Sequence, residues 1–231
     1  MSRAITNLIR LSMIAEATAG TTPATPAMQI ARATSENFEV LRNFVHSEEF
    51  NAVSQVNDQI LVNNRAQGGF NFEWSASDPA IELCLTSALW GAWSSDILLA
   101  GITPAPLSIE TKFEAGATDE YKLLTGMHGN ELLLNFNAGA KVDGTMAFIG
   151  MTSTFAAAGF TGASYVAAGT RAVDTTGDMT LSSTGLTVDA VTKMTLKATN
   201  NDRVHAILGS YNPSAIARGT LDLSGDLEFY M

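Results

Sequence analysis

The chain has 231 residues, with 13 basic and 23 acidic side chains, a formal net charge of −10 and a single cysteine. This length suits one large all-β domain or two small ones. The negative charge argues against docking on nucleic acid or anionic membranes. One cysteine excludes an internal disulfide and a cysteine-based metal site. Only 16 % of the residues are charged, against about 25 % in a typical globular chain, which suggests that other chains cover part of the surface.

The chain opens with a pattern that predicts an arm and a linker. Residues 2–19 have weak helical spacing and are rich in helix-favouring Ala, Leu and Met. The apolar positions of this candidate assembly arm are Ile5, Leu8, Ile9, Met13 and Ile14. Pro23 and Pro26 then favour extended backbone over 20–27. We therefore expect residues 1–27 to form a mobile arm that becomes ordered on assembly, ahead of a single β domain over 28–231.

The N-terminal residues do not predict a targeting segment. Arg10 and Glu16 interrupt any apolar run there, so the pattern lacks the core of a signal peptide. No stretch of the chain approaches the roughly 20 apolar residues of a membrane span. We expect no membrane anchor.

Strand patterns begin after the linker and enclose a long polar stretch. Residues 38–45 predict a strand, and 70–75 predict another because Phe70, Phe72 and Trp74 alternate with polar residues. The stretch 46–67 between them lacks tight-turn residues until its end, and such long excursions are usually functional or disordered. We expect it to be a loop that contacts a neighbouring ring of an assembly, with contact candidates Glu48, Glu49, Asp58, Ile60, Leu61, Val62 and Arg65.

A helix is predicted next, and strands follow to the end of the chain. Asp78 and Pro79 have the pattern of an N-cap and a first-turn proline, and apolar residues follow at helical spacing up to Trp90. Cys84 lies within this helix as a candidate core thiol. Further strands are predicted over 107–113, 121–127, 130–137, 142–151, 186–198 and 203–208, with turns at 126–129 and 137–140 and a loop over 155–169. The pattern favours an antiparallel β-sandwich or barrel with one flanking helix.

The last strand has one apolar and one acidic side. Leu221, Leu223, Leu227 and Phe229 fall on one side, and the carboxylates Asp222, Asp226 and Glu228 fall on the other. We expect the apolar side to pack into the core and the acidic side to face a solvent-filled space, with Asp143 as a further candidate member. The alternative from the pattern alone is an ordinary solvated strand face.

The sequence contains none of the usual catalytic or cofactor motifs. A nucleophile elbow, a phosphate loop and a dinucleotide fingerprint are all missing, and His46, His128 and His205 have no partner at metal-ligand spacing. The cluster at residues 46–49 fits a solvated loop better than a metal site. Asp226 and Glu228 could be read as paired catalytic carboxylates, but such a site needs a pocket that raises one pKa, and no aromatic sugar platform adjoins them. We expect no enzymatic activity, no metal and no cofactor.

The order of these features resembles the tail tube proteins of long-tailed bacteriophages. Four stretches carry the resemblance: the linker at 20–27, the segment from Thr34 through the polar loop to 68–73, Trp90-Gly-Ala-Trp-Ser94, and the strands from Tyr121 to Met151 together with the closing strand. The likeness covers most of the chain from Gly20 onward and rests on the ordered set of stretches, since no single one is specific.

This resemblance implies a structural virion protein. It implies β-sandwich subunits that close into hexameric rings, rings that stack into a tube, and an acidic lumen, lined by Asp222, Asp226, Glu228 and Asp143, through which DNA passes without specific binding. It also implies tape-measure, tail-tip and tail-terminator proteins as partners, with assembly in the host cytoplasm. The alternatives are the inner tube of a contractile injection machine and a secreted or surface β-sandwich module that binds carbohydrate.

Overall fold

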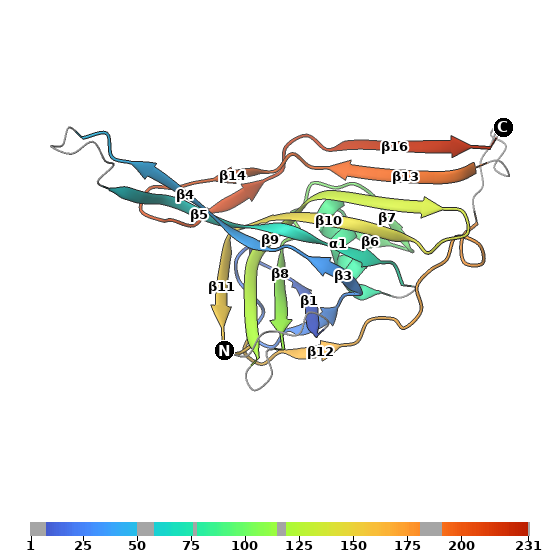
Figure 1. Ribbon diagram of the computed structural model, residues 1–231, viewed down its shortest axis with the longest axis horizontal. Coiled ribbons are helices and arrows are strands. Elements are labelled where there is room, and N and C mark those ends of the chain that lie inside the picture. Colours follow the sequence, from blue (N-terminus) through green and yellow to red (C-terminus); the bar gives the residue numbers. More distant parts are fainter. Residues whose placement is uncertain (1–7, 50–57, 76–77, 115–118, 181–190, 231) are drawn as a thin grey trace.

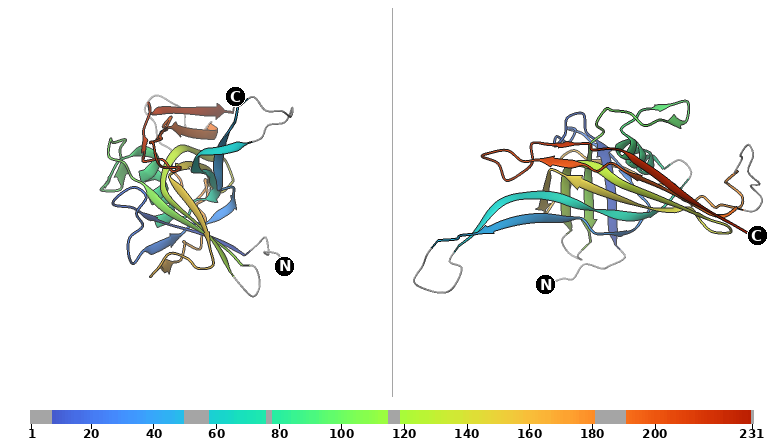
Figure 2. Two further views of the ribbon diagram at one scale, coloured as in Figure 1. Left: turned by 90° about the vertical axis from the view of Figure 1, so that its left-hand side faces the viewer. Right: turned by 90° about the horizontal axis from the view of Figure 1, so that it is seen from above.

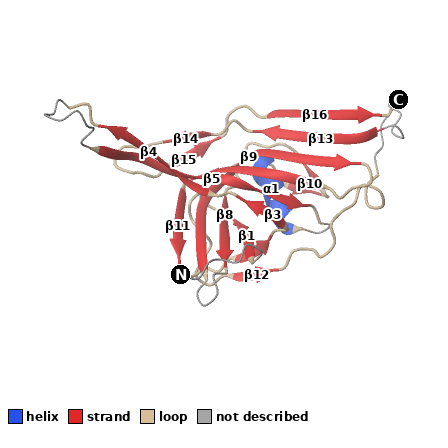
Figure 3. Ribbon diagram, viewed as in Figure 1, coloured by secondary structure: helices blue, strands red, loops and turns tan. Residues whose placement is uncertain are grey.

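The computed structural model describes residues 8–49, 58–75, 78–114, 119–180 and 191–230. The described part is mainly β with a single helix, as predicted (Figure 3). The elements are β1 (Ile9–Ala15), β2 (Ala27–Ile30), β3 (Ala33–Glu36), β4 (Glu39–His46), β5 (Gln59–Glu73), α1 (Pro79–Leu89), β6 (Trp93–Ser94), β7 (Ile97–Leu98), β8 (Leu107–Phe113), β9 (Glu120–Asn137), β10 (Asp143–Gly150), β11 (Thr152–Ala156), β12 (Ser164–Val166), β13 (Val191–Thr199), β14 (Arg203–His205), β15 (Ala215–Ala217) and β16 (Asp222–Phe229).

Twelve of the strands form one bent sheet whose two halves share β9. The half called here the smaller sheet has the order β12–β2–β1–β8–β9–β11. The larger sheet has the order β16–β13–β9–β10–β5, with β3 and β4 both on the far side of β5. Neighbours are antiparallel except β12 and β2. The strands of the smaller sheet run steeply across those of the larger sheet, and the described strands do not close into a barrel (Figure 1).

The bend lies in the middle of β9, where the sequence predicted a turn. The first part of β9 pairs with β8 and β11, and the part after Met127 pairs with β10 and β13. Gly126 has a φ of +63°, a conformation that glycine adopts without strain. Its N–H donates to both carboxylate oxygens of Glu16, at 3.0 and 3.2 Å. The expected turn at 126–129 is therefore wrong, because Glu16 holds the kinked backbone and the strand continues into the second sheet.

The N-terminal segment is also different from the prediction. Residues 9–15 form β1, which lies between β2 and β8 in the smaller sheet, so the helical reading of 2–19 is wrong over the described residues. Leu11 and Met13 are buried in the core. The apolar residues of this segment thus alternate between two sides of a strand. The expectation of an arm set apart from the body does not hold for residues 9–15.

Helix α1 has the predicted ends and packs against the sheets. The Asp78 carboxylate accepts a hydrogen bond from the Ala80 N–H at 3.1 Å, and Pro79 occupies the first turn. Trp90 ends the helix in the left-handed conformation, with its N–H bonded to the Thr86 carbonyl. Arg218 and Asn200 donate to the carbonyls of the last turn, so side chains distant in sequence satisfy the helix end.

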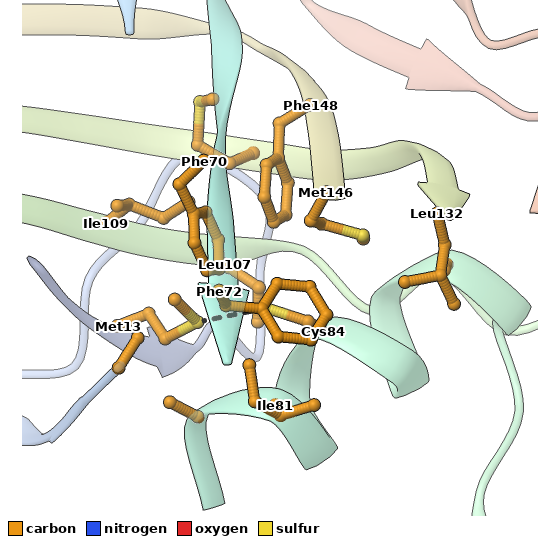
Figure 4. Packing of buried hydrophobic residues seen from close by; sticks show 14 of the residues in the cluster. Met13, Phe70, Phe72, Ile81, Cys84, Leu107, Ile109, Leu132, Met146 and Phe148 are labelled. Carbon is orange, nitrogen blue, oxygen red and sulfur yellow. Dashed lines mark hydrogen bonds between the residues drawn. The ribbon is translucent and has the colours of Figure 1, made fainter. Parts of the chain in front are cut away.

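The core lies between the two sheets and α1 (Figure 4). Rings from β5, from its neighbour β10 and from the connection between β3 and β4 meet there, with the centroids of Phe38 and Phe148 6.1 Å apart and those of Phe70 and Phe148 also 6.1 Å apart. Cys84 is fully buried and its thiol lies 3.4 Å from the Met13 sulfur, which confirms the predicted core thiol. Burial raises the pKa of Cys84.

The polar stretch 46–67 is largely a β-hairpin and not an irregular loop. β4 and β5 pair from Glu39–Gln67 to His46–Gln59, and the Ser47 N–H continues the pairing to the Asp58 carbonyl. The hairpin projects from the body at one end of the long axis (Figures 1 and 2). Its pairing partners lie up to 28 residues apart, and the tip at 50–57 lies outside the described residues. A long stretch between the two predicted strands is present, but its residues 59–67 belong to strand β5 of the hairpin.

The Ala/Gly-rich stretch 155–169, predicted as a loop, contains two short strand segments. It runs from β11 on one edge of the smaller sheet to β12 on the other edge. The fully buried Glu110 carboxylate accepts from the Phe160 N–H and the Tyr165 hydroxyl, and it pairs with Arg10 at 2.9 Å. Burial and the hydrogen bond to Glu110 raise the pKa of Tyr165 to about 12. The stretch is therefore fixed by contacts distant in sequence.

Candidate functional site: the polar face of the larger sheet

The strand register brings the predicted acidic residues of β16 and β10 to one face of the larger sheet. Asp143 on β10 lies opposite Asn135 on β9, which lies opposite Thr195 on β13, which lies opposite Asp226 on β16. Directly opposed residues in a sheet point to the same side. These four strands therefore present a continuous row of polar side chains. The right-hand view of Figure 2 shows the ribbon of the larger sheet from above.

Neighbouring rows extend this surface, here called the polar face. Asp222 lies opposite Thr199, and Glu228 lies opposite Lys193. The charged side chains of the polar face are the six acids Glu73, Glu131, Asp143, Asp222, Asp226 and Glu228 and the four bases Arg32, Lys141, Lys193 and Lys197. Six negative and four positive charges leave a net charge of −2. The four predicted acids are thus brought together, and all of them point away from the core.

Sequence reasoning missed the basic side chains on this face and two of its acids. Lys193, Thr195 and Lys197 alternate along β13, and this alternation could have indicated that β13 belongs to the same polar face. Glu73 and Glu131 lie in segments correctly predicted as strands. The face they share with Asp226 depends on the pairing order of the strands, which local patterns do not give.

Three of the six acids form ion pairs. Glu228 lies 2.8 Å from Lys193, Glu131 lies 3.0 Å from Lys197, and Glu73 contacts both Lys141 and Arg32. Hydrogen bonds from Lys141 and Arg32 lower the pKa of Glu73, and the hydrogen bond to Glu228 raises the pKa of Lys193. In these pairs three carboxylates offset the charge of three of the four basic groups, and the remaining three carboxylates make the face negative overall.

The other three acids have no ion pair within the described part of the chain. Asp143 accepts from the Asn135 amide at 2.8 Å, and Asp226 lies 3.5 Å from the Thr195 hydroxyl. Asp222 is exposed. Nowhere among the described residues do three His, Cys, Asp or Glu side chains gather closely enough to hold a metal ion. Chemically, the polar face is suited to repelling a polyanion.

The opposite side of β16 is not buried, which corrects the expectation that it packs into the core; of the predicted apolar residues, only Leu221, just before the strand, packs against the core. Leu223, Leu227 and Phe229 are 55 %, 43 % and 44 % exposed, and Leu196 beside them on β13 is 45 % exposed. These four residues are called here the apolar strip. The core covers this side of the larger sheet only as far as Leu134 and Ala198. β16 lies beyond it as the edge strand, so the described residues leave about half of each side chain of the strip uncovered.

The other predicted contact residues lie at separate places. On the β4–β5 hairpin, Glu48, Glu49, Asp58, Ile60 and Val62 are exposed, and Leu61 and Arg65 are half-buried. At the N-terminus, Leu8 and Ile9 are exposed, Ile14 is half-buried and Met13 is in the core, whereas Ile5 lies outside the described residues. The structure therefore leaves apolar groups open on the hairpin, on the apolar strip and at the start of β1.

No helix of the described part combines the length and apolar character needed to cross a membrane. No curated protein matches the chain. It is similar to a chain in the cryo-EM structure of the anti-feeding prophage baseplate, six-fold symmetrised, with 5 % identity and a TM-score of 0.48 over 68 % of this chain and 97 % of that one. The family described as phage tail tube protein matches residues 6–231. Because that match spans nearly the whole sequence, the chain belongs to the phage tail tube protein family and is a structural component of a phage tail.

Proposed function

We propose that this protein is the subunit of the tail tube, that its copies close into hexameric rings, and that the rings stack into a tube through which genomic DNA passes. The observation that supports this most is the division of β16, an edge strand with acids on one side and the exposed apolar strip on the other. A strand of this kind is incomplete in a single subunit and complete in an assembly.

Ring closure would join the two open edges of the larger sheet. Within the described residues, β16 pairs only with β13, and β3 and β4 lie at the opposite edge. A head-to-tail contact between these different edges is heterologous and closes into a ring when the rotation between subunits allows it. Closure would also pair the exposed backbone groups that make edge strands prone to aggregation.

The apolar strip would supply part of the association energy. Its four side chains are each about half exposed, so complete burial would contribute about 1 kcal/mol each, or about 4 kcal/mol per contact. That gain offsets part of the cost of association, and strand pairing would add to it. The strip would then be a buried feature of the ring, as the amphipathic pattern of β16 demands.

The polar face would line the lumen. Its net charge of −2 per subunit would give −12 in a ring of six, and three of its carboxylates per subunit have no cationic partner among the described residues. DNA carries a negative charge about every 1.7 Å along its axis, and proteins hold it by neutralising phosphates with Lys and Arg. A negative wall would instead leave DNA mobile.

Stacking of rings would use the projecting hairpin. Ile60 and Val62 are exposed on β5 although they are apolar, and the hairpin reaches well beyond the body (Figure 1). Leu8 and Ile9 would provide a second contact. Tape-measure, tail-tip and tail-terminator proteins would be the other partners, in tails assembled in the host cytoplasm. The inner tube of a contractile injection machine would need the same surfaces, and a sheath around purified tails would identify that arrangement.

A pair of charge substitutions on β16 tests ring formation. Leu227→Asp places a charge in the apolar strip, whereas Ser224→Asp adds the same charge on the polar face of the same strand. Negative-stain microscopy should show rings or tubes for the wild type and for Ser224→Asp, and dispersed subunits with an unchanged circular dichroism spectrum for Leu227→Asp. Tubes from Leu227→Asp would refute burial of the strip, and a wild type that never associates would refute the proposed function.

Charge reversal tests the lumen. Replacing Asp222, Asp226 and Glu228 by Lys changes the charge by +6 per subunit, because each position goes from −1 to +1. These exposed positions should tolerate the change in the folded subunit. Tubes of this variant should retain DNA in a salt-sensitive way because lysines release counterions from phosphates. Tubes that retain no more DNA than the wild type would place this face outside the lumen.

A further inference from the structure

The polar face contains two lysines at its centre, which is unexpected for a surface that lets DNA pass. Lys193 and Lys197 lie on β13, between β9 and β16, and their side chains are 41 % and 44 % exposed. Both point to the same side as Asp226. An accessible ammonium group at this place would bind phosphate and gain affinity through counterion release. The protein therefore needs a way to keep these groups from DNA.

Each lysine is paired with a glutamate from a different neighbouring strand. Glu228 on β16 lies directly opposite Lys193, with 2.8 Å between Oε1 and Nζ. Glu131 on β9 lies opposite Thr199, which follows Lys197 on the same face of β13, and 3.0 Å separate Oε2 of Glu131 from Nζ of Lys197. Asp226 lies opposite Thr195, between the two lysines. Both ammonium groups therefore lie close to carboxylates of the neighbouring strands.

We propose that Glu131 and Glu228 determine the passage of DNA by masking Lys197 and Lys193. The inference rests on the proposed function, in which DNA passes along the polar face. Exposed ion pairs contribute little to folding stability, so the role of these two pairs is to cancel positive charge locally. Asp143, Asp222 and Asp226 then supply the negative potential. The number of acids on the face matters less than which acids lie beside the lysines.

Two variants with equal net charge separate masking from bulk charge. Glu131→Gln with Glu228→Gln removes two acids and uncovers both lysines. Asp222→Asn with Asp226→Asn removes two acids from the same face and leaves both masks in place. A third variant adds Lys193→Gln and Lys197→Gln to the first, which restores the wild-type net charge without any ion pair. The Glu→Gln and Asp→Asn changes keep the size and shape of the side chains they replace, and Lys→Gln keeps a polar side chain that is shorter and uncharged.

The assay is cosedimentation of assembled tubes with a short fluorescent DNA duplex. Only the variant with uncovered lysines should retain the duplex. Two new phosphate contacts predict an association constant that falls about tenfold between about 50 and 200 mM salt. The Asp222 and Asp226 variant and the charge-restored variant should behave like the wild type. Equal retention by the two charge-matched variants would overturn masking, because net charge alone would then explain the result.

A second measurement on the free subunit separates the proposal from the proposed function. Lysine acetylation, followed by mass spectrometry, should be faster at Lys193 after Glu228→Gln because an ion pair keeps the amine protonated. Lys112, which pairs with Glu114 and Asp119, serves as an internal reference. An unchanged rate at Lys193 would overturn masking. Faster acetylation without retention of DNA by tubes would exclude the polar face from the DNA path and refute its proposed place in the lumen together with this role.

Discussion

Glu16 holds together the part of the fold that local sequence patterns did not predict, and its removal should be costly. The residue is 6 % exposed, and its carboxylate accepts from the Gly20 N–H at 2.6 Å, from the Ser108 hydroxyl at 2.6 Å and from the Gly126 N–H. It thereby ties the turn after β1 and the strand β8 to the kink of β9. Hydrogen bonds to a charged group contribute about 1.5–3 kcal/mol each, and they do not simply add.

Glu16→Ala leaves two backbone donors and one hydroxyl without their partner in a buried site. We expect a loss of about 3–5 kcal/mol in the free energy of unfolding, a large part of the roughly 5–15 kcal/mol of a typical domain. Glu16→Gln keeps an acceptor oxygen and should cost about 1–2 kcal/mol. For a chain of this size, each kcal/mol lowers the melting temperature by about 2–4 °C. The alanine variant should therefore melt roughly 10 °C lower.

Urea unfolding followed by circular dichroism measures these losses, in a Leu227→Asp background that keeps the subunit unassembled. Glu120→Ala is the matched control, since Glu120 is exposed at the start of the same strand β9. The control should change the free energy of unfolding by less than about 0.5 kcal/mol. A Glu16→Ala variant as stable as the control would show that the kink of β9 does not depend on this carboxylate.

Two further predictions concern the hairpin and a buried histidine. Ile60→Thr with Val62→Thr keeps strand propensity while removing apolar contact, so rings should form but tubes should be shorter in micrographs; tubes of normal length would exclude this side of the hairpin from stacking. Burial lowers the pKa of His128 to about 4, below the value of about 6.5 expected when unfolded. The unfolded state then binds the proton first, so stability falls as pH drops from 6.5 towards 4, by about 2–3 kcal/mol at pH 4.5. His128→Gln should show a smaller acid loss in urea unfolding, and an equal loss would contradict this assignment.

The elements that the sequence predicted well are those whose cause is local. The N-cap Asp78 and first-turn Pro79 lie beside the helix that they start, and the strand at 107–113 carries its own alternation. The turn expected at 126–129 failed for the opposite reason. Glycines there signal a turn locally, but a carboxylate 110 residues earlier binds the Gly126 N–H and lets the strand continue. Contacts of that range are invisible to a local pattern.

The N-terminal strand shows how two periodicities can compete in a short segment. Leu11 and Met13 are buried two residues apart, which is the strand period, whereas Ile9, Met13 and Ile14 also fit helical spacing. Seven residues are too few to separate the two patterns. The outcome was decided by pairing with β8, whose residues lie about 100 positions later in the chain. Tertiary pairing therefore overrode the helix propensity of Ala, Leu and Met.

For β16, the alternation of acidic and apolar residues was predicted correctly, but the surroundings of its apolar side were not. The acids and the apolar residues do alternate between two sides of the strand, but Leu227 and Phe229 remain almost half exposed. Alternation predicts that one side of a strand is suited to burial. It does not predict whether the same subunit or a neighbouring molecule buries that side. In the proposed ring, the apolar side of this edge strand, which the core of its own subunit does not reach, would be buried by the neighbouring copy. The same burial would account for the low fraction of charged residues in a chain of this size, since apolar side chains that are a liability in a monomer are needed where copies meet.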